Sequence, residues 1–457
     1  MASEFRLLAA TGMVGTGFPE ESLLRGLDMK PDMIGVDAGS TDSGPNDLAT
    51  GSCRYPEASY RRDLGLLLPA ALRAGIPLII GSAGGAGGDA NVDWARRIVE
   101  NIAREKGLKF RLAVIYSGQD KQYLRQRLAE GRIQVLPSGP PIDEAVIDRS
   151  LVIVGMMGCE PIQAALRAGA NVVLAGRASD TSIFAALPLM RGAPAGPVWH
   201  AAKILECGAA AVEYRPSPDS MFATIVGDGF VVEAPNPKLR CTPVSVAAHS
   251  LYENGDPFRI IEPAGTLDTT LARYELVGDR AVRVTGSRFV EADRYTVKLE
   301  GAELAGYQTI VVAGVRDSTV LDELDAYLAS CRANIEMRVK RSFPDLAPSQ
   351  WSLNYRVYGR NGTMGALEPR KDAIGHEVGL IIEATARDQK TANGIASIAR
   401  HQTLHEPVKR WAGLVSNIGL PYGSSDLVRG AVYHFNMHAV VQPDSPTEMF
   451  RHVTVDL

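Results

Sequence analysis

Short apolar runs alternate with amphipathic segments over the first two-thirds of the chain, and this alternation restricts the fold more than any other feature. The segments between the runs carry apolar residues at helical spacing and end at a glycine, as Asn91–Lys106 does before Gly107. Strand, loop, helix and glycine in repeated order predict an α/β fold, a doubly wound, mostly parallel sheet covered by helices. The expected strands are Met33–Val36, Pro77–Ile80, Arg111–Ile115, Leu151–Val154 and Val172–Ala175.

The pattern changes after about Tyr214, where prolines interrupt short alternating segments. This change predicts an irregular, antiparallel part over residues 214–318, forming a subdomain or a lid. A helical pattern follows at Val320–Val339.

The polar stretch Ser342–Gln350 contains two prolines and is the predicted linker between two domains. The expected division is therefore an α/β domain over residues 1–341, a linker over 342–350 and a small α+β domain over 351–457. The closing strand of that small domain is expected at Ala431–Val441.

Composition excludes several classes of protein. The chain has 457 residues, 46% of them hydrophobic and 22% charged, which is ordinary for a globular protein and unlike a disordered one. Its formal net charge of −4 gives no reason to expect a nucleic acid or an anionic membrane as partner. No apolar run has the length of a membrane span, and nothing at the start reads as a signal peptide. The five scattered cysteines, odd in number, fit a reducing compartment, so we expect a cytoplasmic protein.

A dense polar loop follows the first predicted strand, within Ile34–Gly51. A carboxylate just beyond a buried strand can act as a general base, ligate a metal or orient a substrate hydroxyl. The same residue types also form Asx-turns and helix caps, which is the structural alternative. The candidates are Asp37 and Asp42 as catalytic carboxylates, with Ser40, Thr41 and Asn46 as substrate contacts.

A second candidate is the glycine-rich stretch Pro77–Trp94, between a predicted strand and a predicted helix. Exposed backbone N–H groups at such a helix start can bind a carboxylate or a CoA phosphate. The spacing is neither GxxxxGK[ST] nor a clean GxGxxG, so we expect no nucleotide site of those types. A tight turn that needs glycine is the alternative. The residues concerned are Gly84, Gly85, Gly87, Gly88 and Asp89.

A third candidate lies in Asn171–Thr181, where Arg177 follows an apolar strand and a glycine. A guanidinium at a strand's carboxyl end offers a bidentate fork for a carboxylate. Arg177 and Asp180 are candidate catalytic residues. The structural alternative is that Asp180 only pairs with Arg177 or caps the next helix. Glu206 and Cys207 lie at a predicted helix end, and Glu206 is a further substrate contact. No Cys-His signature accompanies Cys207, which argues against a nucleophilic thiol.

The sequence does not identify a cofactor. His401 and His405 stand four residues apart but lack the HExxH pattern, and an exposed helix face explains them equally well. A divalent metal ion near Asp42 and Asp89 is left open as a way to stabilise an enolate. We expect no NAD, FAD or haem.

Three segments in this order resemble the acyclic terpene utilisation AtuA family: GANVVLAGRASD (169–180), KILECG (203–208) and GVRD (314–317). The resemblance covers roughly residues 5–340. The later part, with RNG at 360–362, resembles the small companion protein of that family, which implies a ferredoxin-like module. The family implies a catabolic enzyme of acyclic carboxylates or their CoA esters. The stretch GVDAGSTDSGP departs from the usual acidic start, so the substrate stays open.

These features together favour a lyase, a hydratase or dehydratase of a small hydroxy- or unsaturated carboxylate or its CoA thioester. The alternatives are a non-catalytic acyl-CoA or metabolite-binding subunit of a larger complex, and a hydrolase of the same substrates. Arg360 and Asn361, in a glycine-rich loop, are expected near the site or at a subunit boundary, and the protein is expected to be a homo-oligomer.

Overall fold

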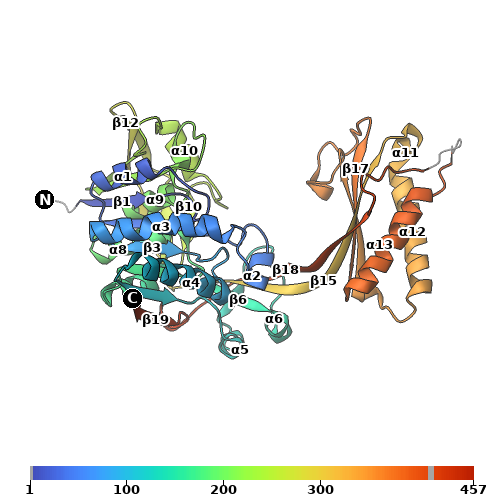
Figure 1. Ribbon diagram of the computed structural model, residues 1–457, viewed down its shortest axis with the longest axis horizontal. Coiled ribbons are helices and arrows are strands. Elements are labelled where there is room, and N and C mark those ends of the chain that lie inside the picture. Colours follow the sequence, from blue (N-terminus) through green and yellow to red (C-terminus); the bar gives the residue numbers. More distant parts are fainter. Residues whose placement is uncertain (1–3, 410–415) are drawn as a thin grey trace. The chain divides into compact units, whose positions relative to one another are not determined.

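The computed structural model describes residues 4–409 and 416–457, which form two compact units (Figure 1). The first unit comprises Met1–Glu303 and Phe435–Leu457, and the second comprises Leu304–His434. Two long strands, β15 (Val297–Val315) and β18 (Asp426–Val441), contribute residues to both units. Within the described ranges, every helix is too short or too polar to cross a lipid bilayer.

The first unit is built on a ten-stranded mixed sheet with the order β12-β13-β9-β8-β1-β2-β3-β7-β4-β19. Its centre is parallel, as the alternating pattern predicted. The parallel strands are β1 (Phe5–Ala9), β2 (Met33–Asp37), β3 (Leu78–Gly81), β4 (Arg111–Ile115) and β7 (Val172–Ala175).

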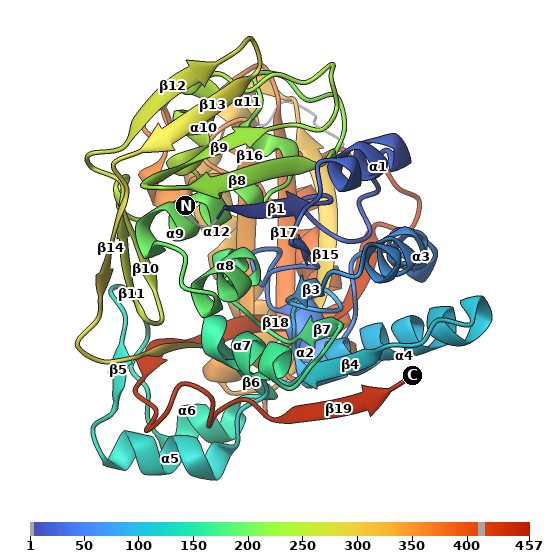
Figure 2. The ribbon, with the colours of Figure 1, turned by 90° about the vertical axis from the view of Figure 1, so that its left-hand side faces the viewer.

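Helices cover both faces of this sheet because successive side chains of a strand point to opposite faces. Leu8, Ile34 and Leu78 belong to one core, packed on α1 (Glu20–Asp28), α3 (Glu57–Ala74) and α4 (Asp89–Lys106). Their neighbours Leu7, Met33 and Ile79 belong to the other core. Figure 2 shows α1, α3 and α4 together on one side of the central strands. The helices on that side are α5 (Lys121–Ala129), α6 (Glu144–Arg149), α7 (Cys159–Arg167), α8 (Asp180–Met190), α9 (Ala195–Leu205) and α10 (Pro243–Ser250).

The antiparallel part is real, but most of it extends the main sheet instead of forming a separate subdomain. Its first strand pairs antiparallel with β1, so that the open edge of the parallel sheet is covered. The added strands are β8 (Met221–Val226), β9 (Gly229–Glu233), β12 (Arg273–Val277) and β13 (Ala281–Thr285), with β19 (His452–Asp456) on the opposite edge. A separate three-stranded sheet consists of β10 (Arg259–Glu262), β11 (Gly265–Asp268) and β14 (Arg288–Glu291).

One predicted parallel strand lies elsewhere. The apolar run Leu151–Val154 falls on β6 (Val152–Met156), which pairs antiparallel with the first part of β15. Its continuous apolar character reflects burial on both faces, which does not reveal the direction of its partner. The short strand β5 (Ile133–Val135) pairs antiparallel with the end of β18.

The second unit is an antiparallel sheet with helices, and its strands have the order β16-β17-β15-β18. Helices α12 and α13 contact one another, and α13 contacts β17 (Figure 1). Their shared core includes Tyr327, Ile335, Leu380 and Ile395. The elements are α11 (Ser318–Asp322), α12 (Leu324–Ser342), β16 (Trp351–Tyr358), β17 (Val378–Ala386) and α13 (Gln389–His405), with short 3-10 turns at Pro348–Gln350 and Gly365–Leu367.

This division differs from the predicted one, which had an α/β domain over residues 1–341, a linker over 342–350 and a small α+β domain over 351–457. The stretch Ser342–Gln350 is a loop inside the second unit, between α12 and β16, instead of a linker between domains. The closing strand β19 belongs to the first unit, where it pairs with β4. Residues 307–315 pair with 378–386, and a pairing this distant in the sequence leaves no local signal.

The loops after β2 and β3 approach each other closely at the carboxyl edge of the main sheet. Gly39 has a φ of +150°, and a Cβ atom there would lie 1.8 Å from the carbonyl oxygen of Gly85. Gly44, in the same loop, has a φ of +107° but open space around it. The first glycine is therefore required by both conformation and space, and the second by conformation alone.

We expect Gly39→Ala to lower the melting temperature well beyond Gly44→Ala. The Gly44 variant carries only backbone strain of about 1–3 kcal/mol, whereas the Gly39 variant must also separate two loops. Differential scanning fluorimetry of both variants measures the difference. Equal, small shifts would mean that the two loops do not depend on this contact.

Candidate active site

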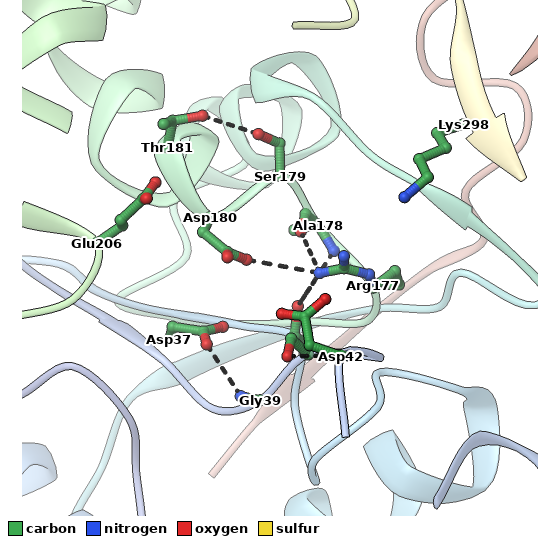
Figure 3. Close-up of polar contacts among 12 residues, drawn as sticks. Asp37, Gly39, Asp42, Arg177, Ala178, Ser179, Asp180, Thr181, Glu206 and Lys298 are labelled. Carbon is green, nitrogen blue, oxygen red and sulfur yellow. Dashed lines mark hydrogen bonds and ion pairs between the residues drawn. The ribbon is translucent and has the colours of Figure 1, made fainter. Parts of the chain in front are cut away.

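Three loops at the carboxyl edge of the parallel strands bring together a group of buried charges (Figure 3). Asp37 is the last residue of β2, Ser82 follows β3, and Arg177 follows β7 after one glycine. Asp180 begins α8 three residues later. Because β2, β3 and β7 are adjacent and parallel, their ends meet at one edge, where α/β sheets bind ligands.

Arg177 is the cation of this group, and its side chain is almost completely buried. Its Nε donates to Glu300 Oε2 at 2.9 Å, and Nη1 donates to the carbonyl oxygen of Ala178 at 3.1 Å and to Ser82 Oγ at 3.3 Å. Asp180 Oδ1 lies 3.5 Å from Nη1. From the sequence we considered two partners for Arg177, which were Asp180 and a substrate. Neither is its closest partner in the structure.

Glu300, on β15, is that partner, and sequence analysis missed it. Lys298 Nζ donates to its other oxygen, Oε1, at 2.8 Å. Although burial opposes ionisation, Arg177 and Lys298 lower the pKa of Glu300 to about 2. The only sequence signal is a charged residue between apolar neighbours in a strand pattern, VKLEGA. Glu300 neutralises Arg177 and fixes the direction of its fork.

Asp37, which is buried, and Asp180, whose side chain is 32% exposed, are two carboxyl groups beside Arg177, and both are predicted site residues. Burial, followed by the charge of Asp180, raises the pKa of Asp37 well above its ordinary value, although Arg177 opposes the shift. Burial raises the pKa of Asp180 to about 6, again against the effect of Arg177. Gly39 N donates to Asp37 Oδ2 at 3.2 Å, and Oδ1 has no hydrogen bond from residues 4–409 or 416–457. The pair can hold one proton in one carboxyl and leave the other ionised.

The end of α9 adds a second buried ion pair. Lys203 Nζ donates to Glu206 Oε1 at 2.6 Å, and both side chains are buried. Burial, followed by Asp180 and Glu262, raises the pKa of Glu206 against the effect of Lys203. Burial and Glu206 also raise the pKa of Cys207, which makes its thiol a poor nucleophile.

A cavity of about 470 Å³ adjoins this end of α9. Its wall includes Met13 from the loop after β1, Cys207 from the end of α9, and the rings of Tyr55, His249 and Tyr252, with Arg215 also at the wall. Burial lowers the pKa of His249 to about 4, with Lys203 and Arg215 adding to the effect, so the ring is neutral near pH 7. A cavity of this size and composition suits a small organic ligand.

The predicted polar loop after β2 is divided between buried and exposed residues. Ser40 and Thr41 are buried, whereas Asp42 is exposed and its N–H donates to Ser40 Oγ at 3.3 Å. Asn46 is exposed at the start of the short helix α2 (Asn46–Thr50), and its side-chain amide donates a hydrogen bond to Asp47 Oδ1. Of this loop's two predicted carboxylates, Asp37 is buried, and the charge of exposed Asp42 also contributes to the raised pKa of Asp180.

The glycine-rich loop after β3 is buried and tightly packed. Gly84 N donates to the hydroxyl of Tyr60 at 3.1 Å, and a Cβ at Gly87 would lie 2.3 Å from the backbone nitrogen of Arg177. Gly85 also has a positive φ, and Gly88 is the N-cap of α4. Asp89 accepts from Gly118 N at 2.8 Å. These contacts favour a turn that seats Arg177, while anion binding by the loop stays a prediction.

Arg360 and Asn361 lie in the second unit, apart in the chain from the residues above. Arg360 Nη2 donates to Asp325 Oδ2 at 2.6 Å. The carbonyl oxygen of Asn361 accepts from Gly365 N at 2.8 Å. Within the described part of the chain, no group of three or more histidine, cysteine or acidic residues is arranged to hold a metal ion.

The sequence model for the acyclic terpene utilisation family protein AtuA matches residues 47–212 and 221–413, which is more than half of the chain. The chain belongs to this family. The match includes Arg177, Asp180 and Glu300 but begins after Asp37 and Asp42. No curated protein and no solved structure matches the chain significantly.

Glu262, at the end of β10, is a second buried carboxylate that sequence analysis missed. It accepts from Ser179 Oγ and Thr181 Oγ1, each at 2.6 Å. Burial raises its pKa to about 7, although the two hydroxyl groups oppose the shift. The pattern RIIEP gives no sign that this glutamate reaches α8, because the contact joins residues about eighty positions apart.

The raised pKa of Glu262 predicts a pH dependence of stability. The folded protein keeps a proton that an unfolded glutamate, with an ordinary pKa of 4.5, has released. The contribution of Glu262 to stability is therefore full below about pH 4.5 and is lost as the pH rises through about 7.

Glu262 should therefore contribute a fall in melting temperature as the pH rises from about 5 to about 8. We expect the fall to be smaller in Glu262→Gln than in the unaltered protein. Thermal unfolding at a series of pH values measures it, and Glu275→Gln, at an exposed position, is the control. Identical pH profiles for Glu262→Gln and the unaltered protein would contradict the assignment.

Proposed function

We propose that this protein is a hydro-lyase that adds water to, or removes it from, a small unsaturated or hydroxy carboxylate or its CoA thioester. The observation that carries the proposal is the pair of carboxyl groups with raised pKa, buried Asp37 and partly exposed Asp180, beside the guanidinium of Arg177. Elimination of water next to a carbonyl needs a base for the carbon-bound proton, an acid for the leaving hydroxyl and a cation for the developing negative charge.

Each group has a role that its environment supports. Asp180, ionised above about pH 6, takes the proton from the carbon next to the carboxylate or thioester carbonyl. The electron pair of that C–H bond forms the double bond, and the C–O bond at the neighbouring carbon breaks. Asp37, whose pKa is raised by burial, is the proposed acid and gives its proton to the departing oxygen, which leaves as water. Hydration follows the same steps in reverse.

Arg177 is suited to holding the carbonyl end of the substrate. Its Nε and Nη1 are bonded within the protein, and Nη2 makes no hydrogen bond with the residues that the structure describes. A guanidinium already neutralised by Glu300 can still donate from Nη2 as negative charge develops on the substrate. The cavity beside Cys207 is the proposed space for the remainder of the substrate.

The two alternatives find less support. A hydrolase needs an activated nucleophile, but the pKa of Cys207 is raised, and buried His200 bonds Ser287 at 2.7 Å and Ser250 at 2.8 Å, where burial lowers its pKa to about 3. A purely binding subunit needs no pair of proton-transfer groups, and burying the carboxyl group of Asp37 is costly.

Several finer predictions belong with this proposal. The second unit runs β15-α12-β16-β17-α13-β18, an order that supports a ferredoxin-like module. Helices on both faces of the parallel strands support a doubly wound sheet. A cytoplasmic location, a homo-oligomer, a divalent metal ion and parts for Asp42, Arg360 and Asn361 stay predictions.

We expect Asp37→Asn to reduce turnover at least about 100-fold, the lower end of what one acid-base group supplies. The melting temperature should fall little or rise, because a buried ionisable group is removed. The test incubates the protein in D2O with a panel of hydroxy and unsaturated carboxylates and CoA thioesters. Proton NMR follows loss of the proton next to the carbonyl and interconversion of the two substrate types.

Ser43→Ala is the control in the same loop, because Ser43 is exposed and is not a predicted site residue. It should keep more activity than Asp37→Asn. Full turnover by Asp37→Asn, or binding of a carboxylate with neither deuterium exchange nor water addition, would favour a binding subunit.

A further inference from the structure

The two residues that flank Asp180 in the chain, Ser179 and Thr181, both bond to Glu262, and we call these three side chains the clamp. Ser179 and Thr181 donate to the two oxygens of Glu262, Oε2 and Oε1 respectively, at 2.6 Å each. The two hydroxyl oxygens are also 2.8 Å apart. All three side chains are buried. One carboxylate thus fixes the residues on both sides of the proposed base.

This arrangement displaces an ordinary helix cap. Ser179 is the N-cap of α8, and serine there usually accepts from the backbone N–H groups of the first turn. Its side chain makes no such bond here and instead donates to Glu262. The bond to Glu262 replaces the usual cap and ties the start of α8 to a distant part of the chain. It therefore fixes the position of the first turn of α8, which begins with Asp180.

Glu262 is itself held in place from a separate sheet. It ends β10, and the hairpin to β11 pairs Glu262 with Gly265. The carbonyl oxygen of Pro263, the next residue, accepts from Thr296 N at 3.2 Å. The glutamate therefore reaches α8 from a structure that is outside the main sheet.

We propose that Glu262 is a positioning residue for Asp180, holding its carboxyl group against Arg177 through Ser179 and Thr181. The inference rests on the proposed function for its catalytic consequence, but the positioning can be measured without it. The charged and titratable groups that face Glu262 or act on it are Asp180 on α8, Lys203 and Glu206 on α9, and Cys159 on α7.

The experiment compares Glu262→Ala and Glu262→Gln with a control at Glu160. Alanine removes both acceptors, whereas glutamine keeps the shape and one acceptor. Glu160 accepts one hydroxyl, that of Tyr295 at 2.8 Å, at the start of α7 and close to Pro263. Glu160→Ala therefore removes a similar bond next to the same hairpin while keeping both hydroxyl groups and the carboxyl group of the clamp.

Crystal structures of the full-length variants give the first readout. In Glu262→Ala, Asp180 Oδ1 should move beyond the 3.5 Å that separates it from Arg177 Nη1, and glutamine should largely restore the distance. Thr181→Val, which breaks one arm, serves if the alanine variant does not fold. An unmoved Asp180 carboxyl in these variants overturns the proposal, whatever the protein catalyses.

Kinetics with a turned-over substrate give the second readout. Glu262→Ala should lower kcat at least about 10-fold, within the range of one positioned proton-transfer group, with KM changed much less. Glutamine should recover most of the loss, and Glu160→Ala should keep kcat. A displaced Asp180 with unchanged kcat would support the clamp and contradict the catalytic role of Asp180.

Discussion

The buried guanidinium of Arg177 is the interaction on which the site depends. A cation removed from water at the centre of a large unit is stable only if its charge and its N–H groups find partners. Glu300 supplies the charge from β15, and Ser82 and Ala178 supply acceptors from the neighbouring loops. Breaking this set would leave a bare charge in the interior, so β3, β7 and β15 must keep their relative positions.

The same cation explains why two further carboxyl groups, one buried and one partly exposed, can lie beside it. Asp37 and Asp180 would each repel the other if both were ionised, and Arg177 offsets only part of that cost. The surroundings therefore raise the pKa of both carboxyl groups, that of Asp180 to about 6. Glu262 adds to this by holding the turn that carries Asp180, so protonation and geometry at the site are set by different elements.

Backbone geometry brings these charges together as much as side-chain bonding does. The close contact of Gly39 with Gly85, and of Gly87 with the nitrogen of Arg177, leaves no room for a side chain between the loops. The glycines therefore have a structural part near the site, whether or not their N–H groups also bind an anion. Glycine is the residue that permits this approach.

The sequence by itself determined the parallel centre of the sheet, the helices around it and the positions of Asp37, Arg177 and Asp180 at strand ends. These features are local, because apolar periodicity and glycine stops reflect neighbours a few residues away. Only the tertiary structure revealed Glu300 and Glu262, the antiparallel pairing of β6 with β15, and the second unit spanning Leu304–His434. Each of these rests on contacts between distant segments, and a glutamate in a strand reads the same in the sequence whether it faces water or a buried arginine.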